Sequence, residues 1–449
     1  MTIPRGRVWK GALLLAILLP FGGLYWRGAM SHSRLVNTDR DATDQSAYMN
    51  YARKMHDSGY SHVGDRNRMP VYPFLLSLMC RPGLTDEELF ERAKVFNVGL
   101  SLAILAALWW IIRTVLSAPQ AVPLLLVVAF TFFLFKAPYV QSEVLYYFLI
   151  FCTFVLMCRY LARPGWRPAL AAGTVAALAH LTKASVLPGM ILFLGAASAK
   201  TLFETVRRGR DRDFAGAASG WVNVGLVALS FCAVLYPYIS TSKRVFGRYF
   251  YNVNSTFYIW YDTRDEIFKG TRAHGDREAW PRMPPEEIPG MAKYLREHTA
   301  GQILERGRQG LLITHRNLVK SFGFYRYLIL YAGLALFVLA FNLRSAAAVA
   351  RERPFLVLFA LCWLLGYGLI YCWIAPINSG PRLPMQQVLP LAFTLACVAF
   401  HGKFDRPVLT LWRRRIEARS LANAGLLVAL LAELHSILTT RILTLFAGA

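Results

Sequence analysis

The sequence predicts an all-α polytopic membrane protein with about eleven transmembrane helices. Apolar residues make up 55% of the 449 positions, and the mean hydropathy is +0.37. These values are typical of a helical membrane protein rather than of a soluble chain of this length. Apolar runs of roughly twenty residues recur along the chain and are long enough to cross a hydrocarbon core of about 30 Å. Basic residues gather in the short segments between these runs, as membrane topology requires.

The first apolar run extends from Gly11 to about Trp26 and follows Arg5, Arg7 and Lys10. No A-x-A-like cleavage site follows it, so an uncleaved span is expected rather than a signal peptide. The other runs lie near residues 95–116, 121–137, 142–161, 167–182, 184–200, 218–239, 323–343, 355–375, 385–400 and 420–440.

The positions of the basic residues test the order of these spans. With the N-terminus inside, the basic clusters fall into the predicted inner loops, whereas one missed or added span would place half of them outside. Two long hydrophilic segments, 27–94 and 240–322, then lie outside and form the working face of a single membrane domain, 1–449. The inner clusters are Arg159, Arg163 and Arg167; Lys200, Arg207, Arg208, Arg210 and Arg212; Arg344, Arg351 and Arg353; and Lys403, Arg406, Arg413, Arg414, Arg415 and Arg419.

Charge and cysteine content exclude two classes of function. The formal net charge of +24 comes from basic residues in the loops between apolar runs. This distribution is typical of a membrane protein that contacts lipids, and it argues against nucleic acid as a partner. Six of the seven cysteines lie in apolar runs, and none has a CxxC or Cys/His metal spacing. The sequence therefore predicts neither a disulfide framework nor a cysteine metal centre.

Three aspartates lie close together early in the first outer segment: Asp39, Asp41 and Asp44. A carboxylate at a membrane surface could deprotonate an incoming hydroxyl or amine, or help to hold a divalent cation. The alternative role is structural, because Asp44 also stands where a helix of residues 44–55 would begin and could serve as its N-cap. Both roles are compatible with the sequence.

Other ionisable residues stand where apolar runs begin or break. Arg66 and Arg68 precede Tyr72 at a return to the membrane surface, where they could bind a lipid phosphate or anchor an amphipathic helix. Ionisable residues at span edges are costly and mark sites or pathways, although a lysine can extend to the interface and a histidine can serve in packing. The residues at span edges are Glu143, His180, Lys183 and Arg382.

In their order and spacing, these pieces resemble the GT-C superfamily of membrane glycosyltransferases. The resemblance is to the branch that contains bacterial protein O-mannosyltransferases and the aminoarabinose transferase acting on lipid A, and it covers about residues 1–400. It is carried by Asp44-Gln45 with Tyr48 and Ala52-Arg53; Arg68-Met69-Pro70-Val71-Tyr72-Pro73; Leu181-Thr182-Lys183; Tyr236-Pro237 with Arg244, Phe246-Gly247 and the stretch from Asn254 to Tyr261; and Gly380-Pro381-Arg382-Leu383-Pro384.

The resemblance implies transfer of a sugar from a polyprenyl-phosphate carrier to a glycan, lipid or protein acceptor, with inversion, at the outer face of the membrane. The absence of an evident retention signal or large lumenal domain favours a bacterial inner membrane. It implies Asp44 as general base and Arg68, Lys183 and Arg382 as cations for the donor phosphate. A divalent cation is a further candidate. Many relatives have Asp-Glu where this chain has Asp44-Gln45, which argues against a paired-carboxylate or metal site there. The implied supporting residues are Asp39, Asp41, Tyr48, Tyr72, Glu143, His180 and Arg244.

Three other functions fit parts of the pattern. A transporter or flippase for a lipid-linked substrate would use the same intramembrane charges, but it predicts inverted repeats, and the sequence shows none. A non-catalytic assembly subunit would use Asp44 only as a helix cap and would tolerate its replacement by asparagine. Another class of enzyme for lipid-linked sugars, such as an O-antigen ligase, would not centre on the early acidic loop.

Overall fold

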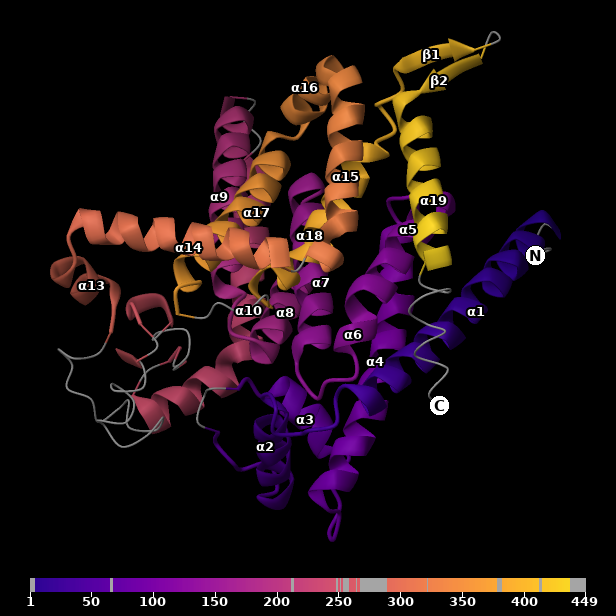
Figure 1. Ribbon diagram of the computed structural model, residues 1–449. Helices are drawn as coiled ribbons and strands as arrows, with labels where there is room; N and C mark the ends of the chain where they lie inside the picture. The colour runs from indigo at the N-terminus through magenta and orange to yellow at the C-terminus, as the bar shows by residue number, and fades with distance from the viewer. Residues whose placement is uncertain are drawn as a thin grey trace.

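The computed structural model describes residues 5–64, 68–210, 214–247, 249–250, 252, 258–263, 265–266, 289–320, 322–377, 382–411 and 414–436. These residues form a bundle of helices with one small β-hairpin (Figure 1). The elements are α1 (Arg5–Leu35), α2 (Gln45–Asp57), α3 (Val71–Ser77), α4 (Asp86–Arg113), α5 (Ala118–Val127), the π-helix η1 (Val128–Phe133), α6 (Leu134–Lys136), α7 (Glu143–Ala162), α8 (Trp166–Thr182), α9 (Leu187–Arg210), α10 (Phe214–Phe246), α13 (Met291–Glu297), α14 (Ala300–Lys320), α15 (Phe322–Phe341), α16 (Leu343–Glu352), α17 (Pro354–Ile374), α18 (Arg382–Ala399), β1 (Pro407–Leu411), β2 (Arg414–Glu417) and α19 (Ala418–Ser436).

The helices confirm the predicted class, a helical membrane protein. Within the described ranges, six helices are long and apolar enough to cross a membrane, and a seventh is added if the pair at α15 and α16, bent by 98°, is one span. Each of the eleven predicted apolar runs overlaps a helix, but several of these helices are shorter or less apolar. The number of eleven crossings therefore stays a prediction.

Local sequence signals explain where these helices begin and how closely they pack. The Thr85 hydroxyl accepts a hydrogen bond from the Glu88 backbone N–H while the Glu88 carboxylate accepts one from the Thr85 N–H, a capping box that starts α4 before its apolar run. Gly173 lets α8 lie directly against α10, because a Cβ there would stand 2.3 Å from the Val227 carbonyl oxygen.

One segment between helices differs from the all-α prediction. The basic segment after α18 contains an antiparallel hairpin, in which Leu411 is opposite Arg414 and Leu409 is opposite Ile416. The β-branched residues Val408 and Thr410 alternate with Leu409 and Leu411, a composition that suits a strand. The hairpin lies at the end of the bundle opposite to α2 and α3 (Figure 1).

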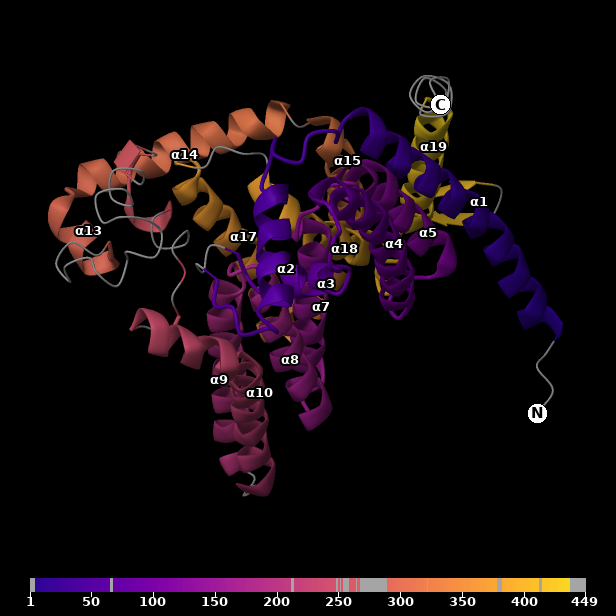
Figure 2. The same cartoon turned by 90° about the horizontal axis from the view of Figure 1, so that it is seen from below.

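The segment that contains α2 and α3 folds into a packed unit at the other end of the bundle. Helices α2 and α3 lie beside one another there (Figures 1 and 2). Tyr48, Tyr72 and Phe90 share a small apolar core with Val140 of the loop before α7. The predicted helix of residues 44–55 is confirmed as α2, and this core fixes it against the ends of α4 and α7.

Helix α14 crosses the bundle at a steep angle to the neighbouring helices (Figure 1). Its Gly310 faces the C-terminal end of α17 so closely that a Cβ would stand 1.7 Å from the Cys372 carbonyl oxygen. Only glycine permits this approach without a shift of the backbone. Helix α14 is thereby held against α17, and Arg306 of α14 lies near this contact, at the C-terminal end of α17.

Candidate functional site

Asp44 occupies the N-cap position of α2, but its side chain makes no capping hydrogen bond. Instead, Arg68 Nη2 donates to Asp44 Oδ1 at 2.8 Å. The Asp44 side chain is half exposed, whereas that of Arg68 is only 14% exposed. The carboxylate is thus turned toward a nearly buried cation and remains open to solvent, which differs from the ordinary capping role.

Tyr48, one turn into α2, lies beside this ion pair. The Arg68 guanidinium lies 5.8 Å from the centre of the Tyr48 ring, and the Tyr48 hydroxyl is 2.9 Å from Ser142 Oγ. Tyr72 meets the same ring edge to face at 5.3 Å. Burial, helped by the negative charge of Glu143, raises the pKa of Tyr48, so the phenol stays neutral at physiological pH.

A second ion pair lies next to Ser142, the hydrogen-bond partner of the Tyr48 hydroxyl. Glu143 begins α7 and Lys183 directly follows α8, and Lys183 Nζ is 3.5 Å from Glu143 Oε1. The Glu143 side chain is 6% exposed and that of Lys183 is 37% exposed. The Lys183 ammonium also lies 5.9 Å from the centre of the Tyr146 ring. A nearly buried carboxylate is therefore matched by a partly exposed cation.

The two ion pairs form one cluster, because Ser142 contacts Tyr48 and precedes Glu143 in the chain. The charges of Glu143, Arg68 and Asp44 all act on the Tyr48 phenol. We call this set the ion-pair cluster. Its members are Asp44, Tyr48, Arg68, Ser142, Glu143 and Lys183.

Two of the predicted supporting aspartates are engaged elsewhere. Asp39 Oδ1 accepts a hydrogen bond from the Asp41 backbone N–H at 2.8 Å. Arg40 lies 3.6 Å from the Asp41 carboxylate and 3.2 Å from that of Asp86, at the start of α4. Asp39 and Asp41 therefore shape the loop that precedes α2 and fasten it to α4.

The remaining predicted residues differ in their surroundings. Tyr72 donates to Asn97 Oδ1 at 2.9 Å and supports the ring of Tyr48. His180 is buried and packs edge-on against Phe231 and Phe250, which matches the packing alternative. Two more residues complete the set: Arg244 is exposed near the end of α10, and Arg382 begins α18 with a side chain outside the described part of the structure.

Gln45, next to Asp44, is fully buried. Its Oε1 accepts from Asn37 Nδ2 at 2.9 Å and from the Val140 backbone N–H at 2.8 Å. Its Nε2 donates to Asn37 Oδ1 at 2.8 Å and to the Asp39 carbonyl oxygen at 3.3 Å. Both donation and acceptance are needed, so an amide fits this position and a carboxylate does not.

The segment around α13 and the start of α14 contains a polar network that the sequence did not predict. Asp262 Oδ1 accepts from the Tyr294 hydroxyl at 2.9 Å and from Arg306 Nη1 at 2.8 Å, and Asp262 Oδ2 lies 2.6 Å from His298 Nε2. The rings of Tyr294 and His298 stack with centres 3.9 Å apart. Partial burial raises the pKa of Tyr294. Wide spacing and the lack of a motif explain why this network was missed.

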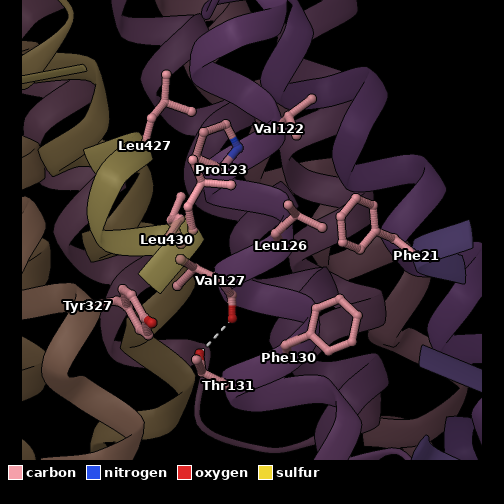
Figure 3. Close-up of a pocket in the computed structure, with 11 residues that line it drawn as sticks. Phe21, Val122, Pro123, Leu126, Val127, Phe130, Thr131, Tyr327, Leu427 and Leu430 are labelled. Atoms are coloured by element: carbon pink, nitrogen blue, oxygen red, sulfur yellow. Dashed lines mark hydrogen bonds between the residues drawn. The ribbon is translucent and has the colours of Figure 1, made fainter. Parts of the chain in front are cut away.

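An apolar pocket of about 130 Å³ lies between α1, α5, η1, α15 and α19 (Figure 3). Phe21, Leu126, Phe130 and Leu430 are among the side chains around it, and the one hydrogen bond drawn there joins the Thr131 hydroxyl to the Val127 carbonyl oxygen at 2.6 Å. The π-helix η1 forms part of its wall, and π-helical turns are frequent at functional sites. The lining suits a hydrocarbon chain.

Among the described residues, no three His, Cys, Asp or Glu side chains come together in an arrangement that could hold a metal ion. No family model, curated protein or solved structure matches the chain. A functional assignment therefore depends on the arrangement of the residues in the ion-pair cluster and in the two cavities.

Proposed function

We propose that the protein is a glycosyltransferase that moves a sugar from a polyprenyl-phosphate carrier to an acceptor at the outer face of the membrane. The observation that carries this proposal is the ion-pair cluster. It places a half-exposed carboxylate, Asp44, next to Arg68, and Tyr48 and Ser142 link this pair to the second pair, which contains the cation Lys183. A base and phosphate-binding cations at one place are what transfer from a sugar phosphate requires.

Arg68 has N–H groups that do not bond to Asp44 and could donate to an anionic ligand. Its Nε is buried and donates no hydrogen bond to any described residue, while Nη2 is held by Asp44. A guanidinium presents several N–H groups in one plane and suits phosphate oxygens. Lys183 adds a compact positive charge that is partly exposed. These two cations are the proposed site for the donor phosphate.

The chemical step is a direct displacement. An acceptor hydroxyl gives its proton to the Asp44 carboxylate while its oxygen bonds to the anomeric carbon, and the bond from that carbon to the phosphate oxygen breaks. The leaving group departs as polyprenyl phosphate, whose new negative charge is stabilised by Arg68 and Lys183. Attack from the face opposite to the phosphate inverts the anomeric configuration. The apolar pocket of Figure 3 suits the isoprenoid tail.

The test is sugar transfer from a panel of radiolabelled polyprenyl-phosphate sugars by the full-length protein in lipid. We expect wild-type turnover with one donor and a loss of about 10²-fold or more in Asp44→Asn, because removal of a general base costs about 10²–10⁴-fold. The matched control is Asp57→Asn, at the exposed end of the same helix, which should keep full activity.

Three outcomes would refute the proposal or its catalytic assignment. Equal turnover in wild type and Asp44→Asn would remove Asp44 as the base. Equal loss in Asp44→Asn and Asp57→Asn would show a general effect on α2 rather than catalysis. No transfer from any donor to any envelope extract, together with movement of intact lipid-linked sugar across the bilayer, would favour a flippase.

A further inference from the structure

A second cavity lies beside α13, in the second outer segment and apart from the ion-pair cluster. It has a volume of about 230 Å³. Aromatic and charged side chains surround it. They come from the segment that follows α10 in the chain and from α13 itself. The ones that matter for binding are Trp260, Asp262, Glu266, Lys293, Tyr294 and Glu297.

The wall of this cavity is built on a rigid frame. Arg306 is 6% exposed and donates through Nη1 to Asp262 and through Nε to the Trp373 carbonyl oxygen at 3.3 Å. Its guanidinium also lies 4.3 Å from the centre of a Trp373 ring. Trp373 Nε1 in turn donates to the Ile259 carbonyl oxygen at 2.8 Å. The loop that bears Trp260 is thereby fastened to α14 and α17.

The lining has a definite chemical preference. Trp260 is the partly exposed aromatic residue at the cavity, and its ring centre lies 6.0 Å from that of Tyr294, which is buried and stacked on His298. Aromatic faces attract the polarised C–H groups of a sugar ring, and carboxylates accept hydrogen bonds from its hydroxyls. Among the described residues, Asp262 is already paired with Arg306, and Glu266 and Glu297 together outweigh Lys293 by one negative charge, which disfavours phosphate and other anions.

We infer that this cavity binds a neutral sugar ring of the acceptor. The reasoning that assigns the ring to the acceptor rests on the proposed function, because the donor carries a phosphate that the acidic lining repels. The binding itself follows from the cavity alone. The site is separate from the ion-pair cluster and shares no residue with it.

The test measures binding without turnover, so its failure is distinct from failure of the transferase proposal. The full-length protein in lipid nanodiscs, free of sugar-based detergent, is titrated with neutral methyl pyranosides in saturation-transfer NMR. We expect one or more of them to bind, and Trp260→Ala to weaken that binding at least about fivefold, the factor set by one aromatic contact. The control is Trp110→Ala, a 75% exposed tryptophan on α4, which should leave binding unchanged.

A charge variant separates a neutral sugar from a cation as the ligand. Glu297→Gln keeps an acceptor oxygen but removes the charge, so a neutral pyranoside should bind within about twofold of wild type, whereas an organic cation should bind clearly less well. Tetramethylammonium is the comparison probe. The inference is overturned if no pyranoside binds, if Trp260→Ala has no effect, or if only tetramethylammonium binds and Glu297→Gln abolishes it.

Discussion

Replacement of Gln45 tests whether its buried hydrogen bonds to Asn37 and Val140 stabilise the fold around the ion-pair cluster. In Gln45→Ala, two buried groups lose their partner: the Val140 backbone N–H and the Asn37 Oδ1 atom. Asn37 Nδ2 keeps its bond to the Pro138 carbonyl oxygen. A buried polar group without a partner costs about 1–3 kcal/mol. With some relief from water entering the space, the free energy of unfolding should fall by about 2–4 kcal/mol.

The assay is a denaturant titration in detergent micelles, followed by the loss of helical signal. The matched control is Gln309→Ala, an exposed glutamine of α14 bonded only to Glu305 among the described contacts, which should change the free energy by about 0.5 kcal/mol or less. A change of less than about 0.5 kcal/mol in Gln45→Ala would refute the reasoning.

The variant Gln45→Glu adds a test of sign. The new carboxylate keeps its two incoming hydrogen bonds but turns an oxygen toward Asn37 Oδ1 and the Asp39 carbonyl oxygen, where Gln45 donates. Burial and these two oxygens favour the protonated acid, so its folded-state pKa lies above its unfolded value. The variant should therefore be closest to wild type near pH 4 and lose stability as the pH rises. Stability that is independent of pH would contradict this.

Two further substitutions follow from close contacts. Gly310→Ala should displace α14 from α17 and lower the free energy of unfolding by about 1–3 kcal/mol, since a Cβ would overlap the Cys372 carbonyl oxygen; an unchanged denaturation midpoint would contradict this. Lys183→Met should cost about 1–2 kcal/mol, because it removes the cation beside the nearly buried Glu143; combining it with Glu143→Gln should restore most of the loss, and additive losses would argue against the pair.

The sequence predicted the helical membrane class and several members of the ion-pair cluster, for a physical reason. Charged residues are costly near apolar runs, so Asp44, Arg68, Glu143 and Lys183 stood out singly. Their pairing could not be predicted, because Glu143 and Lys183 belong to different helices and meet only through the packing of α7 and α8. The packing role of His180 was likewise one of two open alternatives.

The polar network around α13 and α14 was harder to predict because its residues lie in a hydrophilic stretch of the sequence, where charged residues are common. Nothing in the sequence distinguishes Asp262, His298 and Arg306 from other polar residues until the fold places them within hydrogen-bond distance. The sequence likewise gave no indication that Gly310 is needed, although it permits the close approach of α14 to α17. Such contacts depend on tertiary structure rather than on a local pattern.

Charge balance within the ion-pair cluster bears on how the proposed transferase would work. The two carboxylates, Asp44 and Glu143, match the two cations, Arg68 and Lys183, so their formal charges sum to zero. An incoming phosphate has no excess positive charge to meet and must draw a cation away from its carboxylate. Arg68 is the cation whose buried Nε makes no hydrogen bond to the described residues. Under the proposed function, the donor phosphate would therefore compete with Asp44 for Arg68, and Asp44 would be released to act as a base only when the donor is bound.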